Sequence, residues 1–345
     1  MDNSDPTVVK VSSPADILGV LPHRLGFHAR ESLVVVALHG PRRRDELVMR
    51  FDLPEACHDD ELCREVVGRL RQRGADATVL VCYTEAPGPR FGLTRAPLVR
   101  ALRRALGRAG ITVVDALLVR DGRWWSYLCR DASCCPPEGS ALPASPTAAA
   151  GLYAAESVAR GQVVLADRPA LERSIEPVVV DVRAVARATK RLVGALDAGD
   201  IEAVRRLVLP AVDHLVAAWL VGDCAIDDDE ALVVALGLRA KDVRDEVMTL
   251  VLDHDPEMLA GMFTELARRT PDTEAAPVCT VLAWCAYAVG NGALAGVAAE
   301  RAQRAEPGYA LAELILAGLA GMQPPALVRE ISALVRAELT AKAAS

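Results

Sequence analysis

The sequence predicts a two-part protein: an α/β region, with a mixed sheet and flanking helices, followed by an all-helical bundle. Two observations lead to this prediction. Up to about residue 130, short apolar runs alternate with segments whose apolar residues recur every three or four positions. From Asp181 onward only the second, helical pattern remains. We therefore expect an α/β domain over residues 1–177 and a helical domain over residues 181–345.

The strands of the first region are expected at its apolar runs. Residues 33–38, LVVVAL, form a continuous run rich in valine, which is typical of a strand buried on both faces. The polar segment 42–46 has the length of a hairpin connection, so the strands on either side of it should be antiparallel. The strands are expected over residues 8–11, 33–38, 47–51, 78–83, 111–119, 123–129 and 162–165.

Helices are expected between these strands. Ser13 is a predicted N-cap, and the helix that it begins is expected to stop near Pro22. Thr94 is the predicted N-cap of a helix that runs through Ala109. Two further helices are expected over residues 59–73 and 147–160. Helices of this length between strands imply crossover connections and a mixed sheet.

One helix pair in the second region has a tetratricopeptide-like pattern. Small residues stand where two helices would cross closely, and a proline ends the second helix; the pattern is carried by Leu282, Ala283, Ala295, Ala302 and Pro307. The large aromatic residues of that repeat are mostly missing, and only one pair is clear. We therefore expect a single repeat-like hairpin within a helical bundle.

Composition and charge argue against nucleic acid as a partner. Only four of the 39 basic residues are lysine, which is typical of a GC-rich genome and weakens the arginine content as evidence for phosphate binding. Residues 1–170 hold 22 basic and 20 acidic residues, a formal charge of +2, and residues 171–345 hold 17 and 26, a charge of −9. Neither half is strongly basic, so we expect no nucleic-acid binding.

The chain is expected to be cytoplasmic. Its first residues show neither a basic segment nor an apolar segment of a signal peptide. No apolar run approaches the roughly 20 residues that cross a bilayer, so we expect no membrane association. Nine cysteines in a reducing compartment should be thiols rather than disulfides.

Several segments together are similar to those of a known family. They are P-A-D-I-L (14–18), L-G-F (25–27), E-S-L-V-V-V-A-L (31–38), R-F-D-L-P (50–54), W-S-Y-L-C (125–129), C-C-P-P-E-G (134–139) and A-E-R-A-Q-R-A-E-P (299–307). In this combination the chain resembles an actinobacterial family of cytoplasmic proteins classed as a domain of unknown function. The resemblance covers nearly the whole chain and implies no established activity.

The most distinctive local feature of the sequence is a group of three cysteines. Cys129, Cys134 and Cys135 lie within seven residues. Thiolates are good ligands for zinc, which usually takes four of them, but here only three are local and no paired C-x-x-C pattern is present. A redox function is the second interpretation, since Arg123 or Arg130 would lower the pKa of a nearby thiol. The third is a structural role as small side chains in a proline-flanked loop. Apart from zinc at this cluster, no cofactor is predicted.

Polar side chains at the ends of two strands form a second candidate site. Histidine, carboxylate and arginine together suit acid–base chemistry or anion binding. If the two strands are antiparallel, the residues meet at one sheet edge, where a purely structural ion pair between Glu31 and Arg50 is the alternative. Ser32 lacks the G-x-S-x-G context of a hydrolase nucleophile. The candidates are His28, Glu31, Arg50 and Asp52, with His23 and Ser32 beside them.

Two runs of like charge complete the candidates. One face of a predicted helix carries four arginines: Arg100, Arg104 and Arg108, with Arg103. This pattern suits either a solvated surface or an anion-binding face. The acidic run 227–230 suits a helix N-terminus, where peptide dipoles favour carboxylates, or a divalent cation.

Three functions stay open on the sequence alone. Phosphate-loop, dinucleotide-binding, zinc-protease and kinase motifs are absent. The first hypothesis is therefore a non-enzymatic interaction or regulatory protein, with a protein partner bound by the helical domain. The second is an enzyme or small-molecule binder with a pocket at the strand ends. The third is a metal- or redox-active cysteine module.

Overall fold

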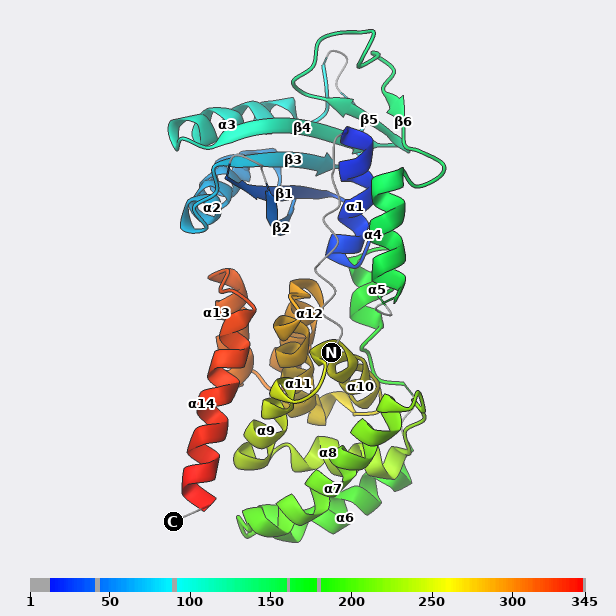
Figure 1. Ribbon diagram of the computed structural model, residues 1–345, viewed down its shortest axis with the longest axis vertical. Coiled ribbons are helices and arrows are strands. Elements are labelled where there is room, and N and C mark those ends of the chain that lie inside the picture. The colour runs from blue at the N-terminus through cyan, green and yellow to red at the C-terminus, as the bar shows by residue number, and fades with distance from the viewer. Residues whose placement is uncertain (1–12, 41–43, 89–91, 160–161, 179–180, 344–345) are drawn as a thin grey trace. The chain divides into compact units, whose positions relative to one another are not determined.

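A computed structural model describes residues 13–40, 44–88, 92–159, 162–178 and 181–343 (Figure 1). The chain divides into two compact units, Met1–Arg168 and Pro169–Ser345. The strand expected over residues 8–11 lies outside the described residues.

The first unit is built on a six-stranded mixed sheet in the order β2-β1-β3-β4-β5-β6. Strand β3 pairs with β4 in parallel, and the other neighbouring strands pair antiparallel. The strands are β1 (Ser32–His39), β2 (Arg44–Asp52), β3 (Ala77–Tyr83), β4 (Thr112–Arg120), β5 (Arg123–Ser126) and β6 (Ser140–Ala141). The mixed sheet predicted from the sequence is confirmed.

The central strands β1 and β3 are buried on both faces. Every residue of β1 from Ser32 to Leu38 is buried, as is β3 from Ala77 to Cys82. This confirms the interpretation of the valine-rich run as a doubly covered strand. The pairing of β1 with β2 sets Ser32 opposite Asp52, so the ends of these two strands share one edge of the sheet.

Two of the predicted strands are shorter in the structure. Strand β5 ends at Ser126 rather than at residue 129, because the Ser126 hydroxyl accepts hydrogen bonds from the backbone N–H groups of Leu128 and Cys129 and turns the chain. The strand predicted over 162–165 is wrong as a full strand: Leu165 forms only an isolated parallel bridge with Phe27.

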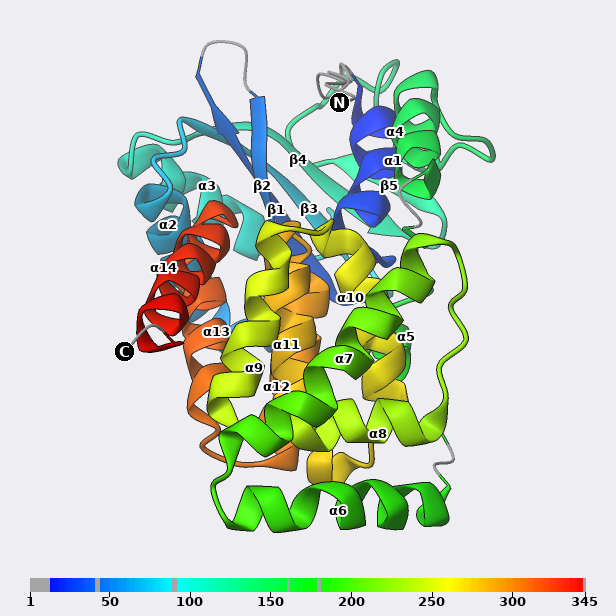
Figure 2. The ribbon, with the colours of Figure 1, turned by 60° about the horizontal axis from the view of Figure 1, so that its bottom comes forward.

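Among the described residues, four α-helices accompany the sheet. Strands β2 and β3, and strands β3 and β4, run in the same direction, and crossovers between parallel strands are right-handed as a rule, which places both connecting helices on one face. Helices α2 and α3 pack side by side. Helices α1 and α4 form a second pair, visible in both views (Figures 1 and 2). The helices are α1 (Pro14–Leu25), α2 (Asp59–Gln72), α3 (Ala96–Arg108) and α4 (Ala148–Ala159).

Two predicted helix boundaries are wrong. Helix α1 continues through Pro22 to Leu25, held at its start by a capping box between Ser13 and Asp16 and at its end by burial of Leu25. Helix α3 begins after Arg95, not after Thr94. The hydroxyl of Thr94 is instead an acceptor for Arg120, at 2.9 Å, so it does not cap the helix.

The second unit is helical throughout its described residues, which confirms the predicted change of pattern. Its helices are α5 (Arg168–Arg173, beginning at the unit boundary), α6 (Val182–Asp197), α7 (Ile201–Leu220), α8 (Asp228–Gly237), α9 (Lys241–Met248), α10 (Pro256–Arg268), α11 (Ala275–Ala288), α12 (Gly292–Ala305), α13 (Ala310–Ala320) and α14 (Ala326–Ala343), with short 3-10 turns over Thr249–Leu252 and Asp272–Glu274.

Helix α11 is the centre of this unit. Its residues from Ala275 to Tyr287 are all buried, and it packs against α8, α9, α10, α12, α13 and α14. A helix that is apolar on every side has no face suited to water and is stable only when surrounded. Its sequence, AAPVCTVLAWCAYA, matches that requirement.

Helices α11 and α12 form the hairpin that the sequence suggests. They are consecutive, pack closely, and are joined at Asn291, whose side chain caps α12 through the N–H of Leu294 at 3.1 Å. Leu282, Ala283 and Ala295 are fully buried. Its likeness to a tetratricopeptide repeat stays a prediction. No described helix combines the length and the apolar character of a membrane span.

Candidate functional site

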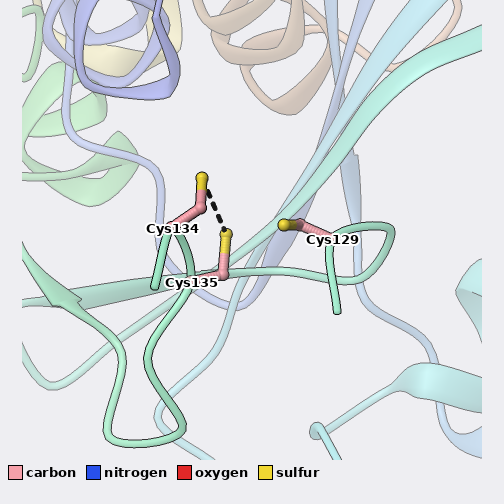
Figure 3. A group of neighbouring side chains, drawn as sticks. All are labelled: Cys129, Cys134 and Cys135. Atoms are coloured by element: carbon pink, nitrogen blue, oxygen red, sulfur yellow. Dashed lines mark hydrogen bonds between the residues drawn. The ribbon is translucent and has the colours of Figure 1, made fainter. Parts of the chain in front are cut away.

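The three clustered cysteines bring their sulfur atoms together. The Sγ atoms of Cys129, Cys134 and Cys135 all lie within 4.8 Å of one another, and those of Cys134 and Cys135 are 3.9 Å apart. Figure 3 shows the side chains of the two adjacent cysteines on the same side of the loop, with Cys129 pointing toward them. The sulfurs therefore form one group, which we call the thiol cluster.

The loop that carries the thiol cluster is anchored to β5. The indole N–H of Trp125 donates to the carbonyl of Pro137 at 3.0 Å, and the Arg123 guanidinium donates to the carbonyls of Glu138 and Gly139, each at 2.9 Å. Gly139 has a φ of +78°, and a Cβ there would lie 2.3 Å from the Trp125 ring. Only glycine satisfies both the backbone conformation and the close contact.

A tight turn places the two adjacent cysteines. The Asp131 carbonyl accepts hydrogen bonds from the N–H groups of Cys134, at 3.1 Å, and Cys135, at 2.7 Å. The Asp131 carboxylate accepts from the N–H and hydroxyl of Ser133, and these hydrogen bonds lower the pKa of Asp131. The turn is therefore fixed by groups inside the loop itself.

Cys135 of the thiol cluster keeps its proton when no cation is bound. Its pKa is raised to about 12, first by burial and then by the neighbouring thiols of Cys129 and Cys134. A redox thiol requires the opposite direction, a lowered pKa. Arg123, one of the two arginines expected to lower it, has its guanidinium engaged by the loop carbonyls. A bound cation would favour the thiolate form of all three sulfurs.

The sulfur spacing fits a thiolate-bound metal ion. Sulfurs at about 2.3 Å from a tetrahedral zinc ion are about 3.8 Å apart. The Cys134–Cys135 separation of 3.9 Å matches this value, and the 4.8 Å bound on the group leaves a contraction of about 1 Å at most. Among the described residues no fourth His, Cys, Asp or Glu joins the group, so one coordination position is left for water or another ligand.

The strand-end residues are arranged in separate pairs. Arg50 pairs with Asp52 on the same strand at 2.5 Å, rather than with Glu31. The Glu31 carboxylate accepts hydrogen bonds from the Thr84 hydroxyl, at 2.9 and 3.1 Å, and from the N–H of Glu85, at 2.6 Å. Glu31 thus ties the start of β1 to the loop after β3. That Glu31, Arg50 and Asp52 act chemically stays a prediction.

The two histidines and Ser32 have other contacts, separate from those pairs. His28 is exposed, and its backbone N–H donates to Leu165. Burial, and then the charge of His28, lowers the pKa of His23, whose ring lies near that of Tyr153. Ser32 is fully buried, and its hydroxyl donates to the carbonyl of Arg30. His28 likewise stays a predicted site residue.

Sequence reasoning missed a group of residues at the same edge of the sheet. Arg95 pairs with Asp59 at 3.4 Å, and the Tyr127 hydroxyl donates to the Thr94 carbonyl at 2.5 Å. Burial raises the pKa of Asp59 and of Tyr127. Arg95 and Glu31 both have positive φ, of 59° and 38°, and such backbone strain clusters at functional sites. The only sequence signal was Tyr127 within the W-S-Y-L-C segment.

A hollow in the helical unit was also missed. It has a volume of about 480 Å³ and is lined by residues of α9, α11, α13 and α14. Arg244 is buried there, pairs with Asp245 at 2.7 Å and donates to the Tyr309 hydroxyl at 2.6 Å. Leu314, on the rim, is 69% exposed. We call this feature the helical hollow; its residues are too far apart in the sequence to form a motif.

The acidic run 227–230 begins a helix, as one of its two interpretations predicted. The Asp227 carboxylate accepts from the N–H groups of Asp229 and Glu230 and caps α8. Asp229 pairs with Arg187 at 2.7 Å, and this contact lowers the pKa of Asp229. These carboxylates are therefore satisfied by the protein.

The fold and the thiol cluster together define a class of protein: a mixed α/β unit with a three-thiol loop at its sheet edge, joined in sequence to a helical unit. The chain belongs to the family described as a domain of unknown function, DUF4192, whose model matches residues 14–326. This confirms the resemblance to a family classed as a domain of unknown function, and the family description assigns no activity. That the family is actinobacterial and cytoplasmic stays a prediction. No curated protein and no solved structure matches the chain.

Proposed function

We propose that the first unit binds a zinc ion through Cys129, Cys134 and Cys135. The observation that carries this proposal is the meeting of three sulfurs within 4.8 Å on a loop held by Trp125 and Arg123. Three protein ligands with an open position are typical of zinc that also binds water or a substrate atom. The proposal requires reduced cysteines, which the cytoplasm supplies.

Metal analysis tests the proposal directly. Protein purified under reducing conditions is expected to carry about one zinc per chain, because the three thiolates outcompete water as ligands. Cobalt loading should give the strong sulfur-to-cobalt absorption of a thiolate site. Cys129→Ser and Cys135→Ser should lose the metal, whereas Cys57→Ser, which changes an exposed cysteine of the same unit, should keep it. Metal-free wild-type protein that also fails to take up cobalt contradicts the proposal.

The same site predicts a dependence of metal affinity on pH. Zinc binds thiolates, so each thiol must release its proton on binding. Because burial, and then the neighbouring thiols, raise the pKa of Cys135 to about 12, its proton is still bound at neutral pH. Affinity should therefore rise with pH, with up to three protons released per zinc, and fall as the pH is lowered. Proton release measured in buffers of different ionisation enthalpy checks this; zero release would mean that the thiols are not the ligands.

A second function, binding of a protein partner, is favoured by the helical hollow. Its volume of about 480 Å³ lies within the range of ligand sites. Leu314 and Ile331 line it and are 69% and 37% exposed, which gives an apolar rim. We propose that it takes the apolar side chains of a partner's helix. A nucleic-acid partner is disfavoured, because residues 171–345 carry a formal charge of −9.

Site-specific crosslinking tests this second proposal. A photoreactive residue at position 314 should capture one reproducible protein, and Ile331→Asp should abolish the capture by placing a charge in the apolar rim. The control position is Leu220, which is 63% exposed on α7 of the same unit. Equal capture at positions 314 and 220 would show that the hollow has no specific partner.

A further inference from the structure

A basic hollow lies where α3 leads into β4. It has a volume of about 570 Å³ and is lined by Arg100, Arg103 and Arg104 together with residues 107 and 110–113. The three arginines stand at i, i+3 and i+4 on the exposed face of α3, because the opposite face buries Leu98, Leu102 and Leu106.

The described residues do not neutralise the charge of this hollow. None of those that line it is an aspartate or a glutamate. Within the part of the chain that the structure describes, Arg100, Arg103 and Arg104 have no ion pair and no hydrogen bond from their side chains. Other arginines of the same unit do pair: Arg69 with Glu65 and Arg95 with Asp59.

The hollow has room for more than one phosphate group. Gly107 and Gly110 line it, and a Cβ at either position would meet nothing within 4 Å, so the space above them is open. Three guanidinium groups present fork-shaped donors that match phosphate oxygens. The volume exceeds that of one phosphate, and none of the described residues that line the hollow is aromatic and able to stack on a base. Recognition would therefore rest on the anionic oxygens.

We propose that the hollow formed by Arg100, Arg103 and Arg104 binds the di- or triphosphate group of a small molecule. This site is separate from the thiol cluster and does not depend on zinc binding. A triphosphate supplies several negative charges close together, which three adjacent arginines neutralise better than they neutralise a single phosphate.

Calorimetric titration tests the proposal with defined probes at near-physiological salt. Tripolyphosphate and pyrophosphate should bind at one site per chain, and inorganic phosphate should bind much more weakly. Arg103→Gln and Arg104→Gln should each reduce the affinity about tenfold or more, which is the usual effect of losing a charged hydrogen-bond donor. If ATP and tripolyphosphate bind with equal affinity, only the phosphates are recognised. If ATP binds more tightly, the site recognises a nucleotide. Both results support the proposal.

The matched control is Arg108→Gln. Arg108 is exposed on the same helix but does not line the hollow, so its loss should change the affinity less than twofold. The folded state of each variant is checked by its thermal unfolding, and Arg103→Lys, which keeps the charge and loses the fork, should restore part of the affinity. Absence of saturable binding by tripolyphosphate, or equal losses in Arg104→Gln and Arg108→Gln, would overturn the proposal and leave only a solvated basic surface.

Discussion

Arg301 shows how much one side chain contributes to the helical unit. It is 2% exposed, lies on α12, and pairs with Asp272 at 3.0 Å. It also donates to the carbonyls of Ala267, at 2.9 Å, and Thr270, at 3.0 Å, just where α10 ends, and to that of Ile175. The planar guanidinium has enough donors for all of these acceptors at once. A single residue therefore joins α12, the end of α10 and the segment after α5.

Replacement of Arg301 should destabilise the helical unit strongly. Arg301→Ala leaves buried carbonyls without donors, and we expect a loss of about 3 kcal/mol in the free energy of unfolding. Arg301→Lys keeps the charge but cannot reach every acceptor, so its loss should be smaller. Urea unfolding followed by circular dichroism measures both. Arg304→Ala, at an exposed position on the same helix, serves as the control; equal effects at positions 301 and 304 would rule out this role.

Sequence reasoning reached the residues of the thiol cluster because they are close along the chain. Cys129, Cys134 and Cys135 are within seven positions, so any compact loop keeps their sulfurs near one another. The contact between Gly139 and Trp125 that shapes the loop had no such signal. Arg244 and Tyr309, in the helical hollow, are 65 positions apart, and only packing of α9 against later helices brings them together.

At the scale of helices and strands, prediction from the sequence was correct where a single local pattern determines the element. Buried strands and capped helices follow from runs and caps, as with β1 and α8. The predictions failed where a side chain forms a hydrogen bond with a residue distant in the sequence. Thr94 is a good N-cap by type, but Arg120 on β4 takes its hydroxyl, and α3 starts one residue later at a strained Arg95. No local signal encodes a partner 26 positions away.

The two buried cysteines of helix α11 are expected to make the protein less stable at alkaline pH. Burial raises the pKa of Cys279 to about 11 and raises that of Cys285 as well. In the unfolded chain these thiols ionise near pH 8.5. Between these values the unfolded state loses protons that the folded state retains, so stability is full below about pH 8.5 and falls as the pH rises toward 11.

The slope of stability against pH tests this prediction. Each buried thiol should contribute about 1.4 kcal/mol per pH unit within that window. Cys279→Ala should lower stability at every pH, because it opens a small cavity, but should flatten the alkaline slope. Cys224→Ser, at an exposed cysteine of the same unit, should leave the slope unchanged. Urea midpoints from pH 7 to 10 give the answer, and parallel curves for Cys279→Ala and wild type would contradict it.

At the scale of the whole molecule, the order of the two architectures was predictable, and the boundary between them depends on contacts. Strand and helix patterns are local, so the change from a mixed sheet to helices was readable from periodicity alone. The compact units meet between Arg168 and Pro169. Residues after that point bond within the helical unit, as the N–H of Val178 does with the carbonyl of Arg268. Contacts across 90 positions leave no trace in local composition.

Because other helices surround α11, loss of those helices would lead the helical unit to aggregate. Helices α13 and α14 both cover it. Deletion of these two helices would uncover buried apolar residues of α11, and such surfaces on different copies adhere to one another. Loss of α13 and α14 would therefore yield precipitate rather than a smaller folded protein, so their cover over α11 is a safeguard against aggregation.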